Sequence, residues 1–217
     1  QQQMMNVSGT ITHIKELIGL NYNSQERENL SQKLPFKLVP LEGSNLTGIQ
    51  LENEKIFYPE QILAYLFKCC FDILKMKDKT IDQIVLTVSP WMNENQRQII
   101  LDAASIANIK IASLLDSTTA AAISYVKIHD SRFPSQKEDS TNAVLIDFGD
   151  VSFNVSVAKL SQKSVEILSC VSDKTIGGSY FTDLLQEYLL TKVEEKYEIN
   201  PRNNKRAMLR FNQAVEK

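Results

Sequence analysis

The residues best suited to chemistry lie together in the stretch AVLIDFGDVSFNVSVAKL, residues 143–160. An apolar run ends at Asp147, turns through Gly149, and re-enters an alternating strand after Ser152. Backbone amides in such a turn can surround phosphate oxygens, and a glycine lets the chain approach them closely. A carboxylate at the strand end could hold the water shell of Mg²⁺, which prefers carboxylate and phosphate oxygens. The same pattern also fits an ordinary hairpin with a bulge, so these residues alone leave both interpretations open.

The composition is typical of a soluble globular protein. Of 217 residues, 43% are hydrophobic and 23% are charged, and the formal net charge is −2. This length suits one large domain or two small ones. A near-neutral charge without a lysine or arginine run argues against a nucleic-acid partner, and no apolar run approaches the length of a membrane span. We therefore expect neither nucleic acid nor membrane as a partner, and a cytoplasmic location.

The elements before residue 80 alternate between helices and short strands. The pattern predicts a short helix over 10–18, a polar excursion or short helix over 21–34, and paired strands over 35–42 and 47–58. Pro59 opens a long helix that runs to about Lys77. Four apolar residues at helical spacing are predicted to form its core face: Ile62, Leu66, Cys69 and Ile73.

A second group of elements reaches residue 127. We expect a buried-type strand over 83–88, a helix over 93–107, a strand over 109–115 and an alanine-rich, closely packed helix over 118–127. Asn93 is expected to cap the first of these helices, with Gln96 in the capping-box position.

The remaining elements are strands followed by helices. Strands over 144–147, 153–160 and 164–170 are expected to form a meander, after which Gly177 and Gly178 mark a hinge. Two helices are then predicted, over 179–197 and from 203 to the end. The chain is therefore interpreted as a mixed α/β protein with a change of lobe near residue 140.

Five stretches, in this order, resemble segments of the nucleotide-binding domain of the heat-shock protein 70 superfamily. They are TVSPWMNENQRQIILDAA at 87–104, LLDSTTAAAISY at 114–125, DFGDVSFNVS at 147–156, IGGSYFTDLL at 176–185 and LRFNQAVEK at 209–217. The resemblance runs from about residue 6 to the end. The Pro90-Trp91 corner, the acidic loop FPSQKEDS, Asp173-Lys174 and the glycine-poor turn resemble the heat-shock protein 110 branch most.

The resemblance implies the actin-like ATPase fold, an α/β fold of ribonuclease H type with two lobes around a nucleotide cleft. Residues 1–140 would form part of lobe I, with an outer subdomain over about 1–80. Residues 141–217 would form part of lobe II, with outer-lobe helices from about 177. We expect an incomplete domain, because the family's first phosphate loop and the end of lobe II have no counterpart here.

The resemblance also implies roles for three catalytic residues. Lys15 matches the lysine that reaches the γ-phosphate, and Asp147 matches the carboxylate that holds Mg²⁺ through water and helps to place the attacking water. Ser152 matches a hydroxyl donor of the phosphate loop, where the family usually has threonine.

Further matches concern nucleotide binding and communication. Gly149, Asp150 and Val151 fall in the phosphate loop, Glu216 matches the ribose-binding carboxylate, and Arg97 matches the arginine of a lobe-to-linker relay. ATP or ADP with Mg²⁺ is therefore the implied cofactor.

Several positions depart from the family pattern. They are Asp150 and Val151 in place of glycines, Asn154 in place of a cation-binding aspartate, Ser117 in place of a glutamate and Ser89 in place of a proline. An aspartate adds negative charge beside phosphates, and a valine restricts φ where glycine is free. Because phosphoryl transfer depends on positioning and charge stabilisation, we expect slow hydrolysis, with nucleotide binding able to survive.

The implied function is that of an ATP-binding chaperone or co-chaperone. We expect a heat-shock-110-like nucleotide exchange factor for a heat-shock-70 partner, with unfolded clients bound through regions absent here and with the 217-residue piece itself inactive. The alternative is a divergent ATP-hydrolysing heat-shock-70 chaperone. A third class, a sugar kinase or filament protein with the same fold, fits the stretches at 87–104 and 114–125 less well.

Overall fold

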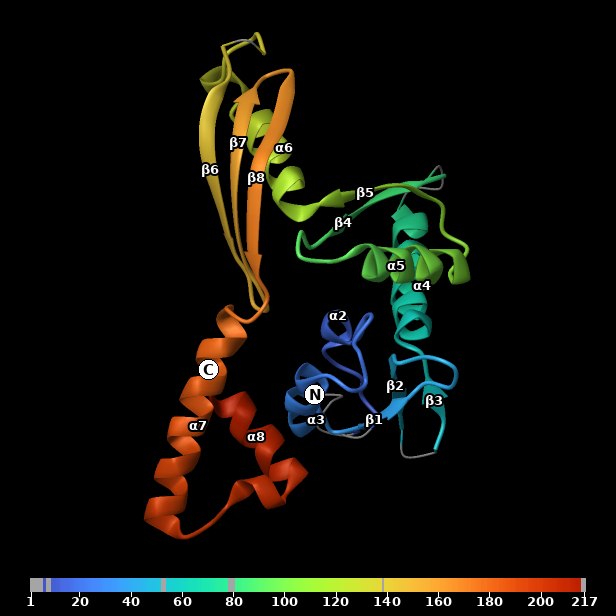
Figure 1. The fold of residues 1–217 in the computed structure, drawn as a ribbon, viewed down its shortest axis with the longest axis vertical. Coiled ribbons are helices and arrows are strands. Elements are labelled where there is room, and N and C mark those ends of the chain that lie inside the picture. Colours follow the sequence, from blue (N-terminus) through green and yellow to red (C-terminus); the bar gives the residue numbers. More distant parts are fainter. Residues whose placement is uncertain (1–5, 7–8, 52–53, 78–80, 138, 216–217) are drawn as a thin grey trace. The chain divides into compact units, whose positions relative to one another are not determined.

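The computed structural model describes residues 6, 9–51, 54–77, 81–137 and 139–215. Its contacts divide the chain into two compact units, whose elements are labelled in Figure 1. The first comprises residues 1–84, 93–112 and 201–211, and the second comprises residues 85–92, 113–200 and 212–217. The expected lobe boundary near residue 140 refers to the complete domain of the family and stays a prediction.

The first unit combines helices with a small antiparallel sheet. Its elements are α2 (Ile14–Leu17), α3 (Gln25–Lys33), β1 (Lys37–Pro40), β2 (Thr47–Gln50), β3 (Ile56–Phe57), α4 (Pro59–Lys77) and α5 (Glu94–Ile106). The strands pair in chain order, with Leu38 opposite Ile49. The core consists of side chains from α2, α3 and this sheet: Leu17, Leu20, Leu30, Leu34, Phe36, Leu38 and Ile49.

The predicted capping box at the start of α5 is confirmed. The Asn93 side chain accepts from the Gln96 amide at 2.9 Å, and the Gln96 side chain accepts from the Asn93 amide at 3.1 Å. Gln96 Nε2 also donates to the carbonyl of Ile18 at 3.0 Å. One side chain therefore closes the helix start and joins α5 to the segment after α2.

The predicted core face of α4 is confirmed only in part, because Ile62 packs against the core of the first unit but two of the four predicted residues are exposed. Leu66 and Ile73 are 43% and 57% exposed, whereas Leu63, Ala64 and Phe71 are buried. Apolar residues occur on most sides of this helix, so helical spacing alone does not identify the side that packs.

Two boundaries in the first unit also differ from the expectation. The helix expected over 10–18 is confined to Ile14–Leu17, and the strand expected over 47–58 is divided into β2 and β3. The first difference lies at helix ends, which commonly fray. The second arises because the chain reverses direction between β2 and β3, which pair antiparallel.

The second unit is built on an antiparallel meander covered by one helix (Figure 1). Its main elements are β5 (Ile111–Asp116), which begins in the first unit, α6 (Ser117–Ile128), β6 (Thr141–Phe148), β7 (Phe153–Ser161), β8 (Ser164–Asp173) and α7 (Gly178–Tyr197). The predicted strand order β6-β7-β8 is confirmed. Ala122 and Val126 of α6 pack on Ala158 and Leu160 of β7, and all four are buried. The alanines let α6 lie close to the sheet.

The other expected elements are present with small differences. β4 (Ile84–Val88) pairs with β5, but Val85 is 56% exposed, so this strand alternates in burial and is not buried on both faces. The last helix, α8 (Lys205–Val215), follows a short 3₁₀ turn at Pro201–Asn203.

Candidate phosphate-binding turn

The turn between β6 and β7 is a tight four-residue loop. Phe148 pairs with Phe153 across the two strands, so residues 149–152 form the whole connection. The amide of Gly149 donates to the carbonyl of Ser152 at 2.9 Å and closes the loop. A side chain at position 149 would bring its Cβ to 3.3 Å from that carbonyl oxygen, a tight contact that a shift of a few tenths of an ångström would relieve.

Three successive amides of the turn make no hydrogen bond within the described residues. Within the described part of the chain, the amides of Asp150, Val151 and Ser152 have no hydrogen-bond acceptor. Consecutive free amides of this kind form concavities that bind anions such as phosphate. The turn therefore has the donor groups that the sequence interpretation required.

A carboxylate and two polar side chains lie beside these amides. Asp147 faces Asn154 in the strand register, so both side chains project from the same face of the sheet. Asn154 Nδ2 donates to Asp147 Oδ2 at 3.2 Å and lies 3.4 Å from Ser152 Oγ. Asn154 is only 2% exposed, and its Oδ1 has no partner among the described residues. The hydrogen bond from a neutral amide orients Asp147 without neutralising its charge.

The donor set fits a magnesium ion held indirectly. Among the described residues, no three His, Cys, Asp or Glu side chains come close enough to hold a metal together. A site with one carboxylate suits Mg²⁺ only where phosphate oxygens and water complete its coordination. Asp147 would meet that condition if the three free amides of the turn held phosphate oxygens.

The turn is fastened to the start of α7. The amide of Gly178 donates to the carbonyl of Gly149 at 3.0 Å, and the amide of Ser179 donates to the carbonyl of Asp150 at 2.9 Å. The Ser179 hydroxyl donates to the same Asp150 carbonyl at 2.7 Å. At Gly177, a Cβ would approach that carbonyl oxygen to 2.2 Å, so only glycine fits.

The glycine pair thus has a packing role that the sequence interpretation missed. Gly177 has φ −168° and ψ −178°, an extended conformation open to any residue. Its requirement for glycine comes from the close approach of the Asp150 peptide. The adjacent glycines were the visible signal, but their contact lies across the chain and could not be assigned from local sequence. The expected hinge at Gly177 and Gly178 stays a prediction.

The backbone at positions 150 and 151 does not require glycine. Neither Asp150 nor Val151 has a positive φ. Residues other than glycine therefore occupy these two positions without left-handed strain. What distinguishes them from glycine is side-chain bulk and, at Asp150, an exposed charge.

The predicted site residues are divided between the two units. Asp147 and residues 149–152 share one hairpin in the second unit. Lys15, exposed on α2, and Arg97, on α5, belong to the first unit, so their predicted roles stay predictions. Glu216 lies outside the described residues.

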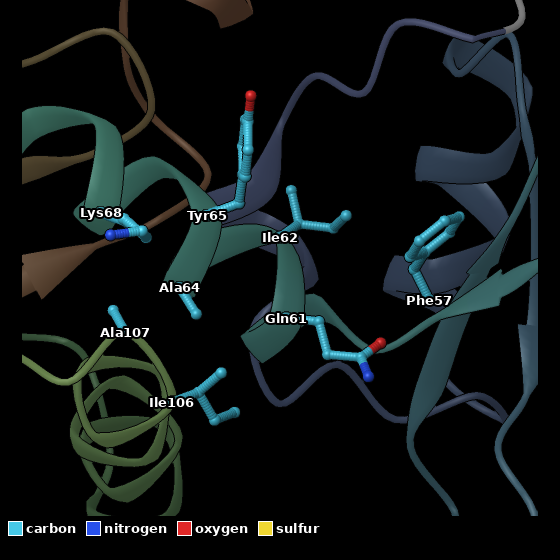
Figure 2. A pocket seen from close by; sticks show the side chains of 8 residues that line it. All are labelled: Phe57, Gln61, Ile62, Ala64, Tyr65, Lys68, Ile106 and Ala107. Atoms are coloured by element: carbon cyan, nitrogen blue, oxygen red, sulfur yellow. The ribbon is translucent and has the colours of Figure 1, made fainter.

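A separate recess lies within the first unit. It has a volume of about 480 Å³ and is lined mainly by apolar side chains from β3, α4 and the end of α5, as Figure 2 shows. Lys68 at its edge lies 3.6 Å from Asp72, and both side chains are more than half exposed. The recess has no group of polar side chains arranged for catalysis.

None of the described helices combines the length and apolar character that a membrane crossing requires.

Known proteins resemble the chain over its whole length. The family model described as Hsp70 protein matches residues 1–217. A heat shock protein homolog of Saccharomyces cerevisiae is 30% identical over 220 residues, covering 100% of this chain and 32% of the relative. Heat shock protein 88 of Dictyostelium discoideum is 30% identical over 227 residues, covering 99% and 28%. Chaperone protein dnaK1 of Prochlorococcus marinus is 26% identical over 218 residues, covering 100% and 31%.

The chain spans about a third of the length of these curated relatives. The family match confirms both the predicted resemblance and the predicted fold class, because the Hsp70 nucleotide-binding domain has the actin-like ATPase fold. The two-unit α/β chain therefore belongs to the Hsp70 family.

Proposed function

We propose that this chain binds ATP or ADP with Mg²⁺ and acts in a nucleotide exchange factor for a heat-shock-70 partner. The observation that carries the nucleotide proposal is the row of three free amides at Asp150, Val151 and Ser152 beside the Asp147 carboxylate. The amides would hold phosphate oxygens, and Asp147 would orient the water around Mg²⁺. The bound ion would supply charge neutralisation of the phosphates.

The composition of the turn supports binding over rapid turnover. Asp150 places an exposed carboxylate in the loop whose amides would face phosphate, and like charges repel. Asn154 gives Asp147 a neutral partner, and Ser117 stands where the family has a glutamate. Each misplaced group can lower a phosphoryl-transfer rate by about 100-fold. A slow or inactive site would retain nucleotide as a ligand that stabilises one shape of the domain.

An exchange role is the activity that such a site best supports. A protein that binds ATP without consuming it can present a fixed surface to a partner and favour the partner's nucleotide-free state. The helix that follows Gly177 carries large exposed apolar side chains that suit a protein surface: Tyr180, Phe181, Leu184, Leu185 and Tyr188. We further propose a cytoplasmic location and binding of unfolded clients by other parts of the complete protein.

The decisive experiment measures ADP release from a purified heat-shock-70 partner. Stopped-flow release of a fluorescent ADP would be followed with and without the complete protein in its ATP state. We expect strong acceleration, together with little ATP hydrolysis by the protein itself. Lys15→Ala would serve as the nucleotide-site variant, and Lys37→Ala, at an exposed lysine on β1, as the matched control.

The alternative function gives a different pattern. A divergent ATP-hydrolysing chaperone would not accelerate ADP release, and it would show turnover that falls in Lys15→Ala and persists in Lys37→Ala. Absence of both activities would refute both proposals. Phosphorylation of a sugar or assembly into filaments would instead assign the chain to another activity of the same fold.

A further inference from the structure

The first turn of α7 makes three kinds of contact with the turn at 149–152. The amides of Gly178 and Ser179 donate to two of its carbonyls at 3.0 and 2.9 Å, and the Ser179 hydroxyl adds a bond of 2.7 Å. Gly177 brings its backbone against the Asp150 peptide, at a separation that excludes a Cβ. The ring of Phe181 lies with its centroid 6.1 Å from that of Phe148, at the end of β6.

These contacts fix the direction of the free amides. In a trans peptide the C=O and N–H bonds lie in one plane and point in opposite directions, and none of the described peptide bonds is cis. The Gly149 carbonyl shares a plane with the Asp150 amide, and the Asp150 carbonyl shares one with the Val151 amide. Because α7 holds both carbonyls, it turns both amides away from the helix. Two of the three phosphate-directed donors thus depend on α7 for their direction.

We propose that Ser179 is a positioning residue for phosphate binding, acting through the Asp150 peptide. This inference rests on the proposed nucleotide-binding function. The Ser179 hydroxyl and amide both hold the Asp150 carbonyl, so the side chain restricts rotation of the peptide that carries the Val151 amide. Ser179 does not need to touch nucleotide for this effect.

The test compares two hydroxyl deletions on the same helix turn. Ser179→Ala removes the bond to the Asp150 carbonyl, whereas Thr182→Ala removes a hydroxyl that bonds only the Gly178 carbonyl of its own helix, at 3.3 Å. ADP and adenosine affinities of the complete protein would be measured by calorimetry. We expect ADP to bind about fivefold more weakly to Ser179→Ala, the effect of one net hydrogen bond. Adenosine affinity should not change, and neither affinity should change in Thr182→Ala.

Two further measurements separate positioning from general destabilisation. Ser179→Thr retains a hydroxyl and should restore most of the ADP affinity. Hydrogen exchange without nucleotide should show faster exchange at the Gly178 and Ser179 amides in Ser179→Ala, with the β7 amides unchanged.

The possible failures are distinguishable. If the unmodified protein binds neither ADP nor ATP, the proposed function is refuted and the positioning role falls with it. If the unmodified protein binds ADP and Ser179→Ala binds it equally well, only the positioning role is refuted. Equal loss of ADP and adenosine affinity would likewise overturn it, because such a loss indicates damage beyond the phosphate turn.

Discussion

Substituting Gly177 by alanine tests the contact between α7 and the turn through stability alone. The extended backbone at this position accepts any residue, so the substitution introduces no conformational strain of its own. Its only direct effect is the added methyl group, which would lie 2.2 Å from the Asp150 carbonyl oxygen and 2.6 Å from the Asp150 carbonyl carbon. Both are backbone atoms that cannot rotate aside as a side chain can.

The expected magnitude follows from the displacement that relieves this clash. Ordinary van der Waals contact begins at 3.4 Å, so the Asp150 peptide must move by about 1.2 Å relative to Gly177. The carbonyl that moves accepts the Ser179 amide and hydroxyl at 2.9 and 2.7 Å, and a shift of this size breaks both bonds. At about 1 kcal/mol for each net hydrogen bond, the free energy of unfolding should fall by about 2 kcal/mol.

The neighbouring glycine supplies the matched control. A Cβ at Gly178 would meet its nearest atom, Asp150 Oδ1, at 3.4 Å, which is ordinary contact. Gly178→Ala should therefore leave stability within about 0.5 kcal/mol of the unmodified chain. Denaturant unfolding of both variants measures the difference, and hydrogen exchange at the Ser179 amide localises it. Equal stability of the two variants would refute the close approach of Gly177 to the turn.

Three further predictions concern packing, capping and ionisation. Leu160→Ala, at a side chain 1% exposed beneath α6, should lower the free energy of unfolding by about 3 kcal/mol in denaturant titrations. Gln96→Ala should cost about 2 kcal/mol by the same measurement, because it removes the reciprocal cap of α5 and the bond to the Ile18 carbonyl. The hydroxyl and amide of Thr175 hold the pKa of Asp173 below its usual 3.8, so Thr175→Val should raise that pKa in an NMR titration.

The sign of the last effect determines how stability depends on pH. A carboxyl group whose folded pKa is depressed stabilises the fold above its unfolded pKa, and that contribution is lost as pH falls through the folded pKa. The contribution of Asp173 is therefore present above its usual pKa of 3.8 and is lost progressively as pH falls through its lower folded pKa. An unchanged Asp173 titration in Thr175→Val would contradict the assigned hydrogen bonds.

A fall of less than about 1 kcal/mol in the free energy of unfolding for Leu160→Ala would contradict its packing beneath α6, and the same result for Gln96→Ala would contradict the cap of α5.

Local patterns were sufficient to predict most of the elements. Pro59 identified the first residue of α4, and Asn93 with Gln96 identified the start of α5, since a proline or a capping box stabilises the helix start through neighbouring residues only. Alternating residues and the single glycine at 149 likewise predicted the β6–β7 hairpin. These features depend on residues within four positions of one another.

The buried side of a helix and the contacts between distant residues were harder to predict from the sequence. The buried side of α4 was identified only in part, because apolar residues on several sides of a helix do not indicate which side meets a neighbour. The bond between Ser179 and Asp150 joins residues 29 positions apart, so no local pattern encodes it. The same holds for the bond between Asn154 and Asp147, which exists because antiparallel pairing places the two side chains opposite each other.

The sequence by itself determined the family, the order of the elements and the residue types of the turn between β6 and β7. Only the tertiary structure decided that the turn accepts Asp150 and Val151 without positive φ, and that glycine is required at Gly177. The physical reason is that residue types specify local conformation and available donors, whereas the direction of a donor depends on what holds its peptide. In this chain the amides of the turn are directed by a helix that begins at Gly178.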